Sequence, residues 1–551
     1  MIIGLNLAAG AEESKGADVV DVTNIAIAPY EFAEITPRSI DTVKAEQTLE
    51  QWGLLRPRKN GWTWGERTGQ AGNYIFTKLH MTTKDGGDFS IGKLVLSGVR
   101  MDAGSANFDK AVIYDLDMQG IVPSQKSKQK KEGEKSGLDW DGGRIQARKM
   151  VLTYPSANFA NGIFAAFSGD METYDEMVII PEYGHQAAYD IKISSSKNTS
   201  AIKINHWILG KGISGEGVLS LAGIQSYGGF DSNTSFSLAS IDIRGVNLKK
   251  LKPIFTVIAE DVRQEQKQAN GKKKRKANNK KNDDLTEAQG RAVLAFMNPY
   301  IPNYSHASLR NLKMQGDGFQ MFLSRIDAVI KQQDGKIYSN METSPLTIMV
   351  TPEARGDSNN LQELGFDRIE LSLGHEAVMD PALDKIHIKN SYIEMKDGFK
   401  LSYNFDGIGL MGLMEGAVMA NVSDQELSDK QILAIIASLG KFKSQIMFED
   451  RSILDLGFAL AAQSPNKDKA ELKKQASALM TLLPVFVKQK EFRPIVTEFS
   501  AAVQNLIESG GKLVIATDWD LPLSENETKK LLKDDEAAIE FFGLSVVHVA
   551  K

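Results

Sequence analysis

From about residue 20 to residue 420, apolar and polar residues alternate with a period of two. Successive side chains of a β-strand point to opposite faces, so this alternation predicts strands that are apolar on one side only. The clearest segments are 91–98, 111–118, 187–194, 201–209, 235–248, 366–373, 385–395 and 399–405. In 91–98, Ile91, Lys93, Val95 and Ser97 alternate with Gly92, Leu94, Leu96 and Gly98. Lys396, Asp397 and Gly398 separate two such segments, which predicts a β-hairpin.

After Ala420 the apolar spacing changes to three and four, which predicts amphipathic helices. We expect helices at 424–442, 468–488, 494–509 and 525–542, strands at 444–462 and 512–518, and a shorter helix at 286–296. Ser423 and Glu426 form a capping box, and Pro484 should kink or end the second helix. The predicted class is α+β: mainly antiparallel β with long amphipathic strands, plus a helix-rich C-terminal region.

Two segments resemble each other at an offset of 147 residues: 89–101 (FSIGKLVLSGVRM) and 236–248 (FSLASIDIRGVNL). A duplicated β unit would explain the offset, although any strand that ends in a glycine turn can look similar. We therefore expect a signal remnant or flexible N-terminus at 1–18, β units at 19–123 and 138–262, basic disordered loops at 124–137 and 263–284, a β-rich unit at 285–420, and a helix-rich α+β region at 421–551.

The charge of the 551-residue chain is uneven. The two basic loops hold fourteen bases and five acids, which leaves 51 bases against 65 acids elsewhere. An acidic body disfavours specific nucleic-acid binding. The run Lys272, Lys273, Lys274, Arg275 and Lys276 is a candidate site for anions or an anionic membrane surface, or else a solvated loop.

Cysteine is absent, which excludes disulfides, thiolate metal sites and a cysteine nucleophile. The start of the chain has a short apolar stretch that ends at Ala8, Ala9, Gly10 and Ala11, like the end of a signal peptide without its basic region. We expect an exported, periplasmic protein without a transmembrane helix. The apolar run 407–420 is too short to span a bilayer and contains Glu415.

No motif predicts a catalytic, metal or cofactor site. Two glycine patterns follow strands, at Gly210, Gly212 and Gly215 and at Gly407, Gly409 and Gly412. A dinucleotide site needs a helix next, whereas 217–223 and 413–422 resemble strand or loop. The seven histidines are scattered, and the carboxylate pairs have no identifiable partner. We expect no cofactor.

Trp52, Trp62 and Trp64 lie in a short region rich in arginine. They form a candidate aromatic surface for stacking or for a membrane interface. The alternative is that they pair across a hairpin that turns at Lys59, Asn60 and Gly61.

The pattern of the repeated Ile- and Leu-rich strands and of 510–547 resembles the exported β-rich envelope proteins of Gram-negative bacteria, such as AsmA-like and YdgA-like proteins. The resemblance implies an envelope role such as lipid handling, and it supplies no site residue. We therefore expect a non-enzymatic binding or scaffold protein that handles a lipid or another apolar ligand. The alternatives are a carboxylate-based hydrolase on a β-rich frame and a surface or adhesion protein with anion-binding basic loops.

Overall fold

The computed structural model describes residues 39–57, 61–82, 87–102, 104–120, 143–156, 159–162, 185–194, 201–211, 217–229, 234–247, 249–250, 287–316, 318–350, 368–423, 440–462, 468–488, 490–519, 526 and 543–550. The chain forms two compact units. The first unit comprises 26–278 and 306–317, and the second comprises 1–25, 279–305 and 318–551.

The first unit contains one antiparallel sheet beside the helix α1 (Thr42–Gln51). Its strands are β1 (Glu66–Gln70), β2 (Asn73–Thr82), β3 (Asp88–Ser97), β6 (Lys110–Gln119), β7 (Arg144–Thr153), β8 (His185–Ser194), β9 (Ala201–Lys211), β10 (Gly217–Gly229), β11 (Thr234–Val246) and β12 (His306–Gly316). Each strand in this series pairs with the next. A separate hairpin, β4 (Arg100–Asp102) and β5 (Ser105–Asn107), lies against α1.

The core of the first unit lies at its β2–β7 end. Asp41 caps α1, and its carboxylate accepts from the Lys44 amide at 3.1 Å. Leu49 of α1 is fully buried in the same cluster as Phe76 of β2 and Leu96 of β3. Residues 124–137, expected to form a basic loop, lie outside the described residues, and the strands before and after them, β6 and β7, pair directly.

A line of left-handed residues crosses the first unit's sheet. On every second strand one residue has φ near +50° to +64°: Lys78, Asp115, Asp190, Gly223 and Asn311. The residue opposite each is also skipped by the pairing, so the ladder is interrupted at the same level on all these strands. In each strand the alternation of side chains between the two faces therefore shifts by one residue at this level. The apolar and polar faces of the sheet stay continuous across it. At Gly223, an added Cβ would lie 2.1 Å from Asn205 Nδ2.

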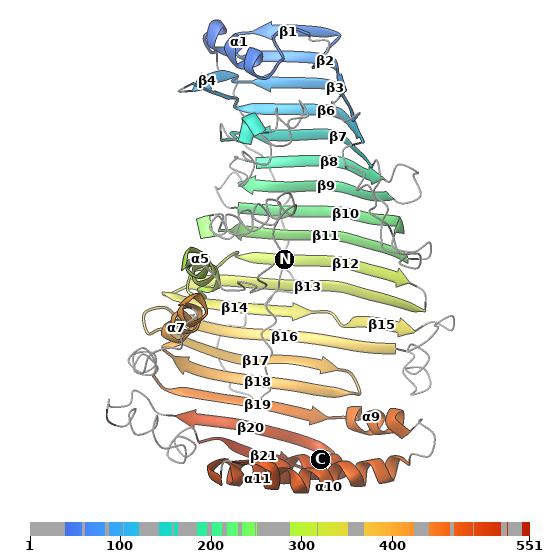
Figure 1. Cartoon of the computed structure of the whole chain (residues 1–551), viewed down its shortest axis with the longest axis vertical. Helices are drawn as coiled ribbons and strands as arrows, with labels where there is room; N and C mark the ends of the chain where they lie inside the picture. Colours follow the sequence, from blue (N-terminus) through green and yellow to red (C-terminus); the bar gives the residue numbers. More distant parts are fainter. Residues whose placement is uncertain are drawn as a thin grey trace, which may run out of the picture. The chain divides into compact units, whose positions relative to one another are not determined.

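The second unit also consists of antiparallel strands, and it holds five further named helices (Figure 1). Its strands are β13 (Phe319–Gln333), β14 (Lys336–Thr343), β15 (Leu346–Val350), β16 (Arg368–Asp380), β17 (Lys385–Met395), β18 (Phe399–Ile408), β19 (Phe442–Asp450), β20 (Gly511–Trp519) and β21 (Ser545–Val549). Its helices are α5 (Glu287–Met297), α7 (Leu410–Ser423), α9 (Ile453–Ala462), α10 (Lys469–Phe486) and α11 (Arg493–Ser509), with a 3₁₀ turn at Lys490–Phe492.

Strands β14 and β15 lie end to end, and both pair with β13 on one side and β16 on the other. From β16 to β21 each strand pairs antiparallel with the next. Helix α5 contacts α7, and α10 packs on α11, which lies along β21.

The structure confirms a mainly antiparallel β fold with helices, and the hairpin at Lys396–Gly398 joins β17 to β18. The helices expected at 286–296, 468–488 and 494–509 correspond to α5, α10 and α11. Gly510 closes α11 with φ 67°, and Pro484 lies inside α10 two residues before its end. The helices expected at 424–442 and 525–542 fall almost wholly outside the described residues.

Three local predictions are wrong. Residues 453–462 form helix α9 instead of strand, because Asp450 caps them and accepts from the Leu454 amide at 3.1 Å. Residues 413–422 lie within helix α7 instead of strand or loop, and Glu426, the expected capping partner of Ser423, lies outside the described residues. The phase in 91–98 also shifts: Ile91 and Leu94 are both buried in the core because β3 crosses the left-handed line between them.

His185 makes the first unit sensitive to acid. It is 7% exposed, and its Nδ1 lies 2.8 Å from Thr153 Oγ1 on β7. Burial, with the nearby charge of Lys110, lowers the pKa of His185 to about 4. The folded state therefore disfavours the protonated imidazole, so stability is full above the ordinary pKa of about 6.5 and is lost as pH falls toward 4.

We predict that this histidine costs about 2 kcal/mol of unfolding free energy between pH 8 and pH 5. Denaturant unfolding at both pH values should show a larger loss in the wild type than in His185→Gln. Equal losses in the two proteins would contradict the assignment.

Candidate functional site

Strand register gives the second unit's sheet one apolar face and one polar face. Directly paired residues share a face. One row of paired residues crosses five neighbouring strands, β16 to β20: Leu373, Ile393, Leu401, Phe448 and Leu513. The next row on the same face includes Tyr403, Ile446 and Ile515. We call this side of β13–β20 the second-unit apolar face.

Much of this face remains partly accessible. The five residues of the row are all only partly buried, and Ile446 is 42% exposed. One end is closed: Ile337, Met379, Ile386 and Phe405 form a buried cluster, and Tyr300 and Leu410 near α5 and α7 pack on it. Contiguous apolar surface in contact with water is unfavourable by roughly 25 cal/mol per Å², and such patches mark binding surfaces.

The few polar groups on this face have partners. His375 Nδ1 lies 2.7 Å from Ser391 Oγ, and Ser391 donates to the Lys389 carbonyl at 3.3 Å. Burial lowers the pKa of His375, so its imidazole is neutral near pH 7. Asp450 is held by the amide of α9. The face therefore presents hydrocarbon with little free hydrogen-bonding capacity.

The first unit has a comparable surface beyond its core. A row of paired residues crosses β8 to β12 and consists of Ala188, Trp207, Leu221, Ile241 and Leu309. Trp207, Leu221, Ile241 and Leu309 are only partly buried. The same face of β2 and β3 is packed against the α1 core and is buried. The accessible part of the first-unit apolar face is thus confined to β8–β12.

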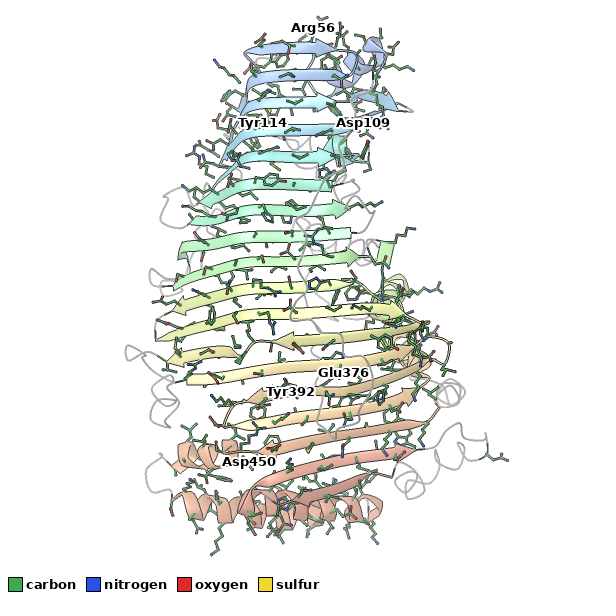
Figure 2. The ribbon with its side chains drawn as sticks, turned by 180° about the vertical axis from the view of Figure 1, so that it is seen from behind. Arg56, Asp109, Tyr114, Glu376, Tyr392 and Asp450 are labelled. Atoms are coloured by element: carbon green, nitrogen blue, oxygen red, sulfur yellow. The ribbon has the colours of Figure 1, made fainter. Side chains whose placement is uncertain are left out.

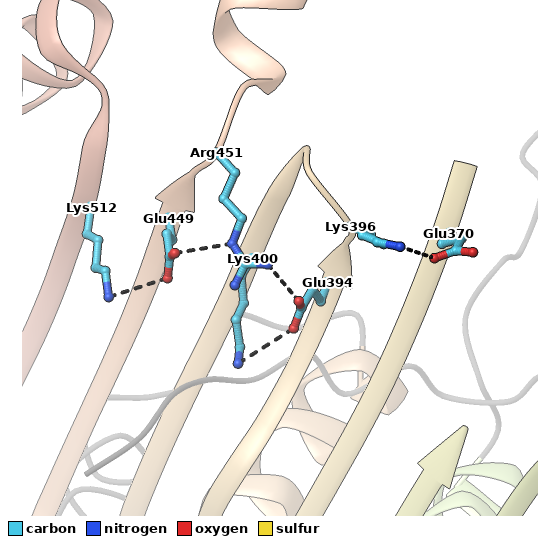
Figure 3. A network of polar contacts seen from close by, with 7 residues as sticks. All are labelled: Glu370, Glu394, Lys396, Lys400, Glu449, Arg451 and Lys512. Atoms are coloured by element: carbon cyan, nitrogen blue, oxygen red, sulfur yellow. Dashed lines mark hydrogen bonds and ion pairs between the residues drawn. The ribbon is translucent and has the colours of Figure 1, made fainter. Parts of the chain in front are cut away.

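The opposite face of the second unit is charged in alternating signs. Glu394, Lys400, Glu449 and Lys512 form one row across β17 to β20. Arg451 joins it, with Nη1 2.6 Å from Glu394 Oε1 and Nε 3.1 Å from Glu449 Oε1 (Figure 3). Lys512 Nζ lies 3.4 Å from Glu449, and Lys400 Nζ lies 3.7 Å from Glu394.

A second charged row lies near the other end of the same strands. Lys385 Nζ lies 3.0 Å from Asp406 Oδ1, and Lys443 Nζ lies 2.8 Å from Asp518 Oδ2. Lys400 of the first row also lies over an aromatic ring, with its Nζ 4.6 Å from the ring centroid of Tyr392, which Figure 2 labels. The charged groups on this face pair with one another in contact with water. The hydrophobic effect therefore does not favour covering this face.

The opposite face of the first unit combines cations and aromatic rings with a buried apolar cluster of Val112, Val151, Ala187 and Ile208. Lys93, Tyr114, Lys149 and Tyr189 are paired in one row, and each lysine lies about 6 Å or less from a tyrosine ring (Figure 2). Nearby, Arg144 binds both oxygens of Asp117, which holds the pKa of that carboxyl below its usual range. These contacts fix the strand register on the side away from the apolar face.

A histidine, a serine and an aspartate lie together on β9, β10 and β11. His206 Nε2 lies 3.0 Å from Ser220 Oγ, and Ser220 donates to Asp242 at 2.5 Å. The serine lies between the other two groups and is 4% exposed, so the histidine is not held by the aspartate as a base for it. The buried carboxylates of Asp109 and Asp327 lie beside Arg100 and Arg325.

The tryptophans expected at a surface lie mostly in the core. Trp52 ends α1 and is 5% exposed, and its Nε1 donates to Asn161 Oδ1 at 2.9 Å. Trp62 is 3% exposed, and Trp64 packs edge-on against Phe76. Burial of these apolar rings determines their position in the fold more than the neighbouring arginines do. The expected hairpin pairing fails too, because Trp52 follows a helix. The candidate anion site Lys272–Lys276 lies outside the described residues.

The glycine pattern 407–412 does precede a helix, contrary to the sequence expectation. Gly409 has φ 84° between β18 and α7. Strand β18 nevertheless pairs antiparallel with both β17 and β19, whereas a dinucleotide fold requires a parallel crossover. At Gly217–Gly229 the other pattern continues into strand β10, as expected.

Within the described residues, no group of three or more His, Asp or Glu side chains could hold a metal ion. In the same part of the chain, no helix is long and apolar enough to cross a membrane. Sequence reasoning missed the apolar rows because they depend on which strands are neighbours. The signal in the sequence was the alternation of apolar and polar residues, which does not tell which residues of neighbouring strands pair.

Comparison with known proteins gives a match within the second unit. A family model described as an uncharacterized protein matches residues 392–548, from the end of β17 to β21. The matched segment supplies four of the five residues of the second unit's apolar row and most of its charged rows. None of the curated proteins matches the chain.

We predict that Arg451→Met lowers the unfolding free energy of the second unit by about 1–2 kcal/mol, because two glutamates lose a shared cation. The loss should shrink in 0.5 M NaCl, as screening weakens charged contacts. Arg368→Met is the matched control: its side chain is 59% exposed beside Glu370, so it should change stability by less than about 0.5 kcal/mol. Equal effects of the two substitutions in denaturant unfolding would contradict the role of the row.

Proposed function

We propose that this protein is a non-enzymatic, exported envelope protein that binds a lipid or another apolar ligand on the first-unit and second-unit apolar faces. The observation that carries the proposal is the row Leu373, Ile393, Leu401, Phe448 and Leu513, which is continuous over five strands and partly accessible. A ligand that covers the row would remove hydrocarbon from water.

The dimensions and chemistry suit an acyl chain. Five strands spaced by about 4.8 Å place the ends of the row about 19 Å apart. One leaflet of a bilayer has a hydrocarbon layer of about 15 Å. Neutral His375, bonded to Ser391, adds no charge that an acyl chain would have to desolvate, and the carboxylate of Asp450 is already buried.

The envelope location is supported by sequence features. These are the absence of cysteine, the signal-like residues Ala8–Ala11, and the resemblance to AsmA-like and YdgA-like proteins. As part of the same proposal, the segments 89–101 and 236–248 derive from duplicated β units, and 421–551 is a helix-rich region that supports the end of the sheet. If the apolar faces hold no ligand, the proposed function is that of an envelope scaffold.

The direct test is native mass spectrometry, with lipid extraction, of the protein purified from the envelope fraction of its own cells. We predict co-purifying lipid in stoichiometric amount. A clean mass of the bare chain would refute lipid binding and leave the scaffold role.

A pair of substitutions tests the face itself. Ile446 lies on the second-unit apolar face at 42% exposure, and Val547 of β21 lies on the polar side at 51% exposure. Ile446→Asp should lower bound lipid at least tenfold, because a carboxylate would be buried under the ligand. Val547→Asp introduces the same change in a similarly exposed strand residue, and it should retain wild-type lipid. Equal retention by both variants would contradict the assignment of the face.

A further inference from the structure

The outer surface of α10 is apolar although nothing in the described structure covers it. Leu479, Leu482, Val485 and Phe486 are 61%, 48%, 71% and 73% exposed. Their spacing of three, six and seven residues places them on one side of the helix. The inner side is occupied, since Ser477 is 6% exposed and donates to Glu508 of α11 at 2.6 Å.

The segment of the sequence that forms this surface is uncharged, and basic residues follow it. No charged residue occurs from Gln475 to Val487. Lys474 precedes this stretch, and Lys488, Lys490 and Arg493 follow it, with Glu491 as the one acid among them. The four cations are exposed and form no ion pair within the described part of the chain. This combination of exposed Leu, Val and Phe with flanking cations is typical of helices that lie in the interface of an anionic bilayer.

We propose that the outer surface of α10, with Lys488, Lys490 and Arg493, docks on an anionic membrane surface. The apolar side chains enter the headgroup boundary, and the cations contact lipid phosphates. The 18-residue helix is not apolar enough to cross a bilayer, which fits a helix that lies in the interface. The charges select a bilayer over a second copy of this chain, because two such surfaces would bring like charges together. This inference goes beyond ligand binding by the sheets and does not rest on it.

The absence of native cysteine allows a probe at a single site. Phe486→Cys and Leu383→Cys would each be labelled with an environment-sensitive fluorophore in the full-length protein. Leu383, in the turn after β16, is the matched control because it is 59% exposed. Vesicles of phosphatidylcholine, with and without 30% phosphatidylglycerol, serve as the membrane.

We predict a blue shift and protection from iodide at position 486 with the anionic vesicles, and no change at position 383. Unchanged emission at 486 would overturn the proposal even if the protein sediments with the vesicles, since the basic loops could then be responsible. A blue shift at 486 without vesicles that depends on protein concentration would assign the surface to a second copy and also overturn it.

Substitutions separate the two contributions in vesicle sedimentation. Val485→Asp combined with Phe486→Asp should abolish binding to anionic vesicles. Lys488→Gln and Lys490→Gln should each weaken it about fivefold, and 0.5 M NaCl should remove that difference. Wild-type binding by the double aspartate variant would contradict docking through α10. None of these results depends on whether lipid co-purifies on the sheet faces.

Discussion

The structure depends on the way antiparallel register keeps one side of each sheet apolar. Residues that face each other across a strand pair lie on the same side, so strands with the same alternation add their apolar halves into one surface. In the second unit this addition runs without interruption from Leu373 of β16 to Leu513 of β20. A shift of one residue in any strand would put a charge such as Lys400 or Glu449 in that row.

The polar side enforces the register that the apolar side requires. Glu394, Lys400, Glu449 and Lys512 alternate in sign over neighbouring strands, so a slipped strand would place like charges opposite each other. Arg451 spans two of these strands and ties the glutamates together. Each contact is modest in water, but the set makes the alternative pairings worse. The cation and tyrosine row of the first unit has the same effect there.

Cover for the apolar sides is unequal. Helix α1 buries the β2–β3 end of the first unit, and Tyr300 with Leu410 closes one end of the second. Helix α11 turns its buried side, which includes Leu506, toward the sheet, while its partner α10 leaves Leu479 and Phe486 exposed. Accessible hydrocarbon thus occurs both on the broad sheet faces and on the outer surface of α10. The chemistry of these two surfaces differs, because Lys488, Lys490 and Arg493 follow the apolar side chains of α10.

The sequence predicts most strands, the hairpin at Lys396–Gly398 and helices α5, α10 and α11, because local periodicity determines these elements. It could not predict the phase of β3, since the left-handed residues opposite and beside it include Lys78 and Asp115, which carry no turn signal. It placed α9 in a strand because ILDLGFALAA is apolar all round, and apolar runs of that length fit either element. Trp52 and Trp62 were assigned to a surface because their arginine neighbours are local, whereas the core that buries them is assembled from α1, β2 and β3. The apolar rows required strand order, which periodicity does not contain.

The most direct test compares two adjacent residues of β18 that point to opposite faces. Tyr403 pairs with Ile446 on the second-unit apolar face, and Asn404 pairs with Gln445 on the polar face. A photoreactive benzoyl-phenylalanine would replace one or the other, with irradiation in the producing cells and detection of attached lipid by mass spectrometry. The account predicts lipid crosslinks at position 403 and none at position 404. Equal crosslinking at the two positions, or none at 403, would contradict the claim that the apolar face is the ligand-binding surface.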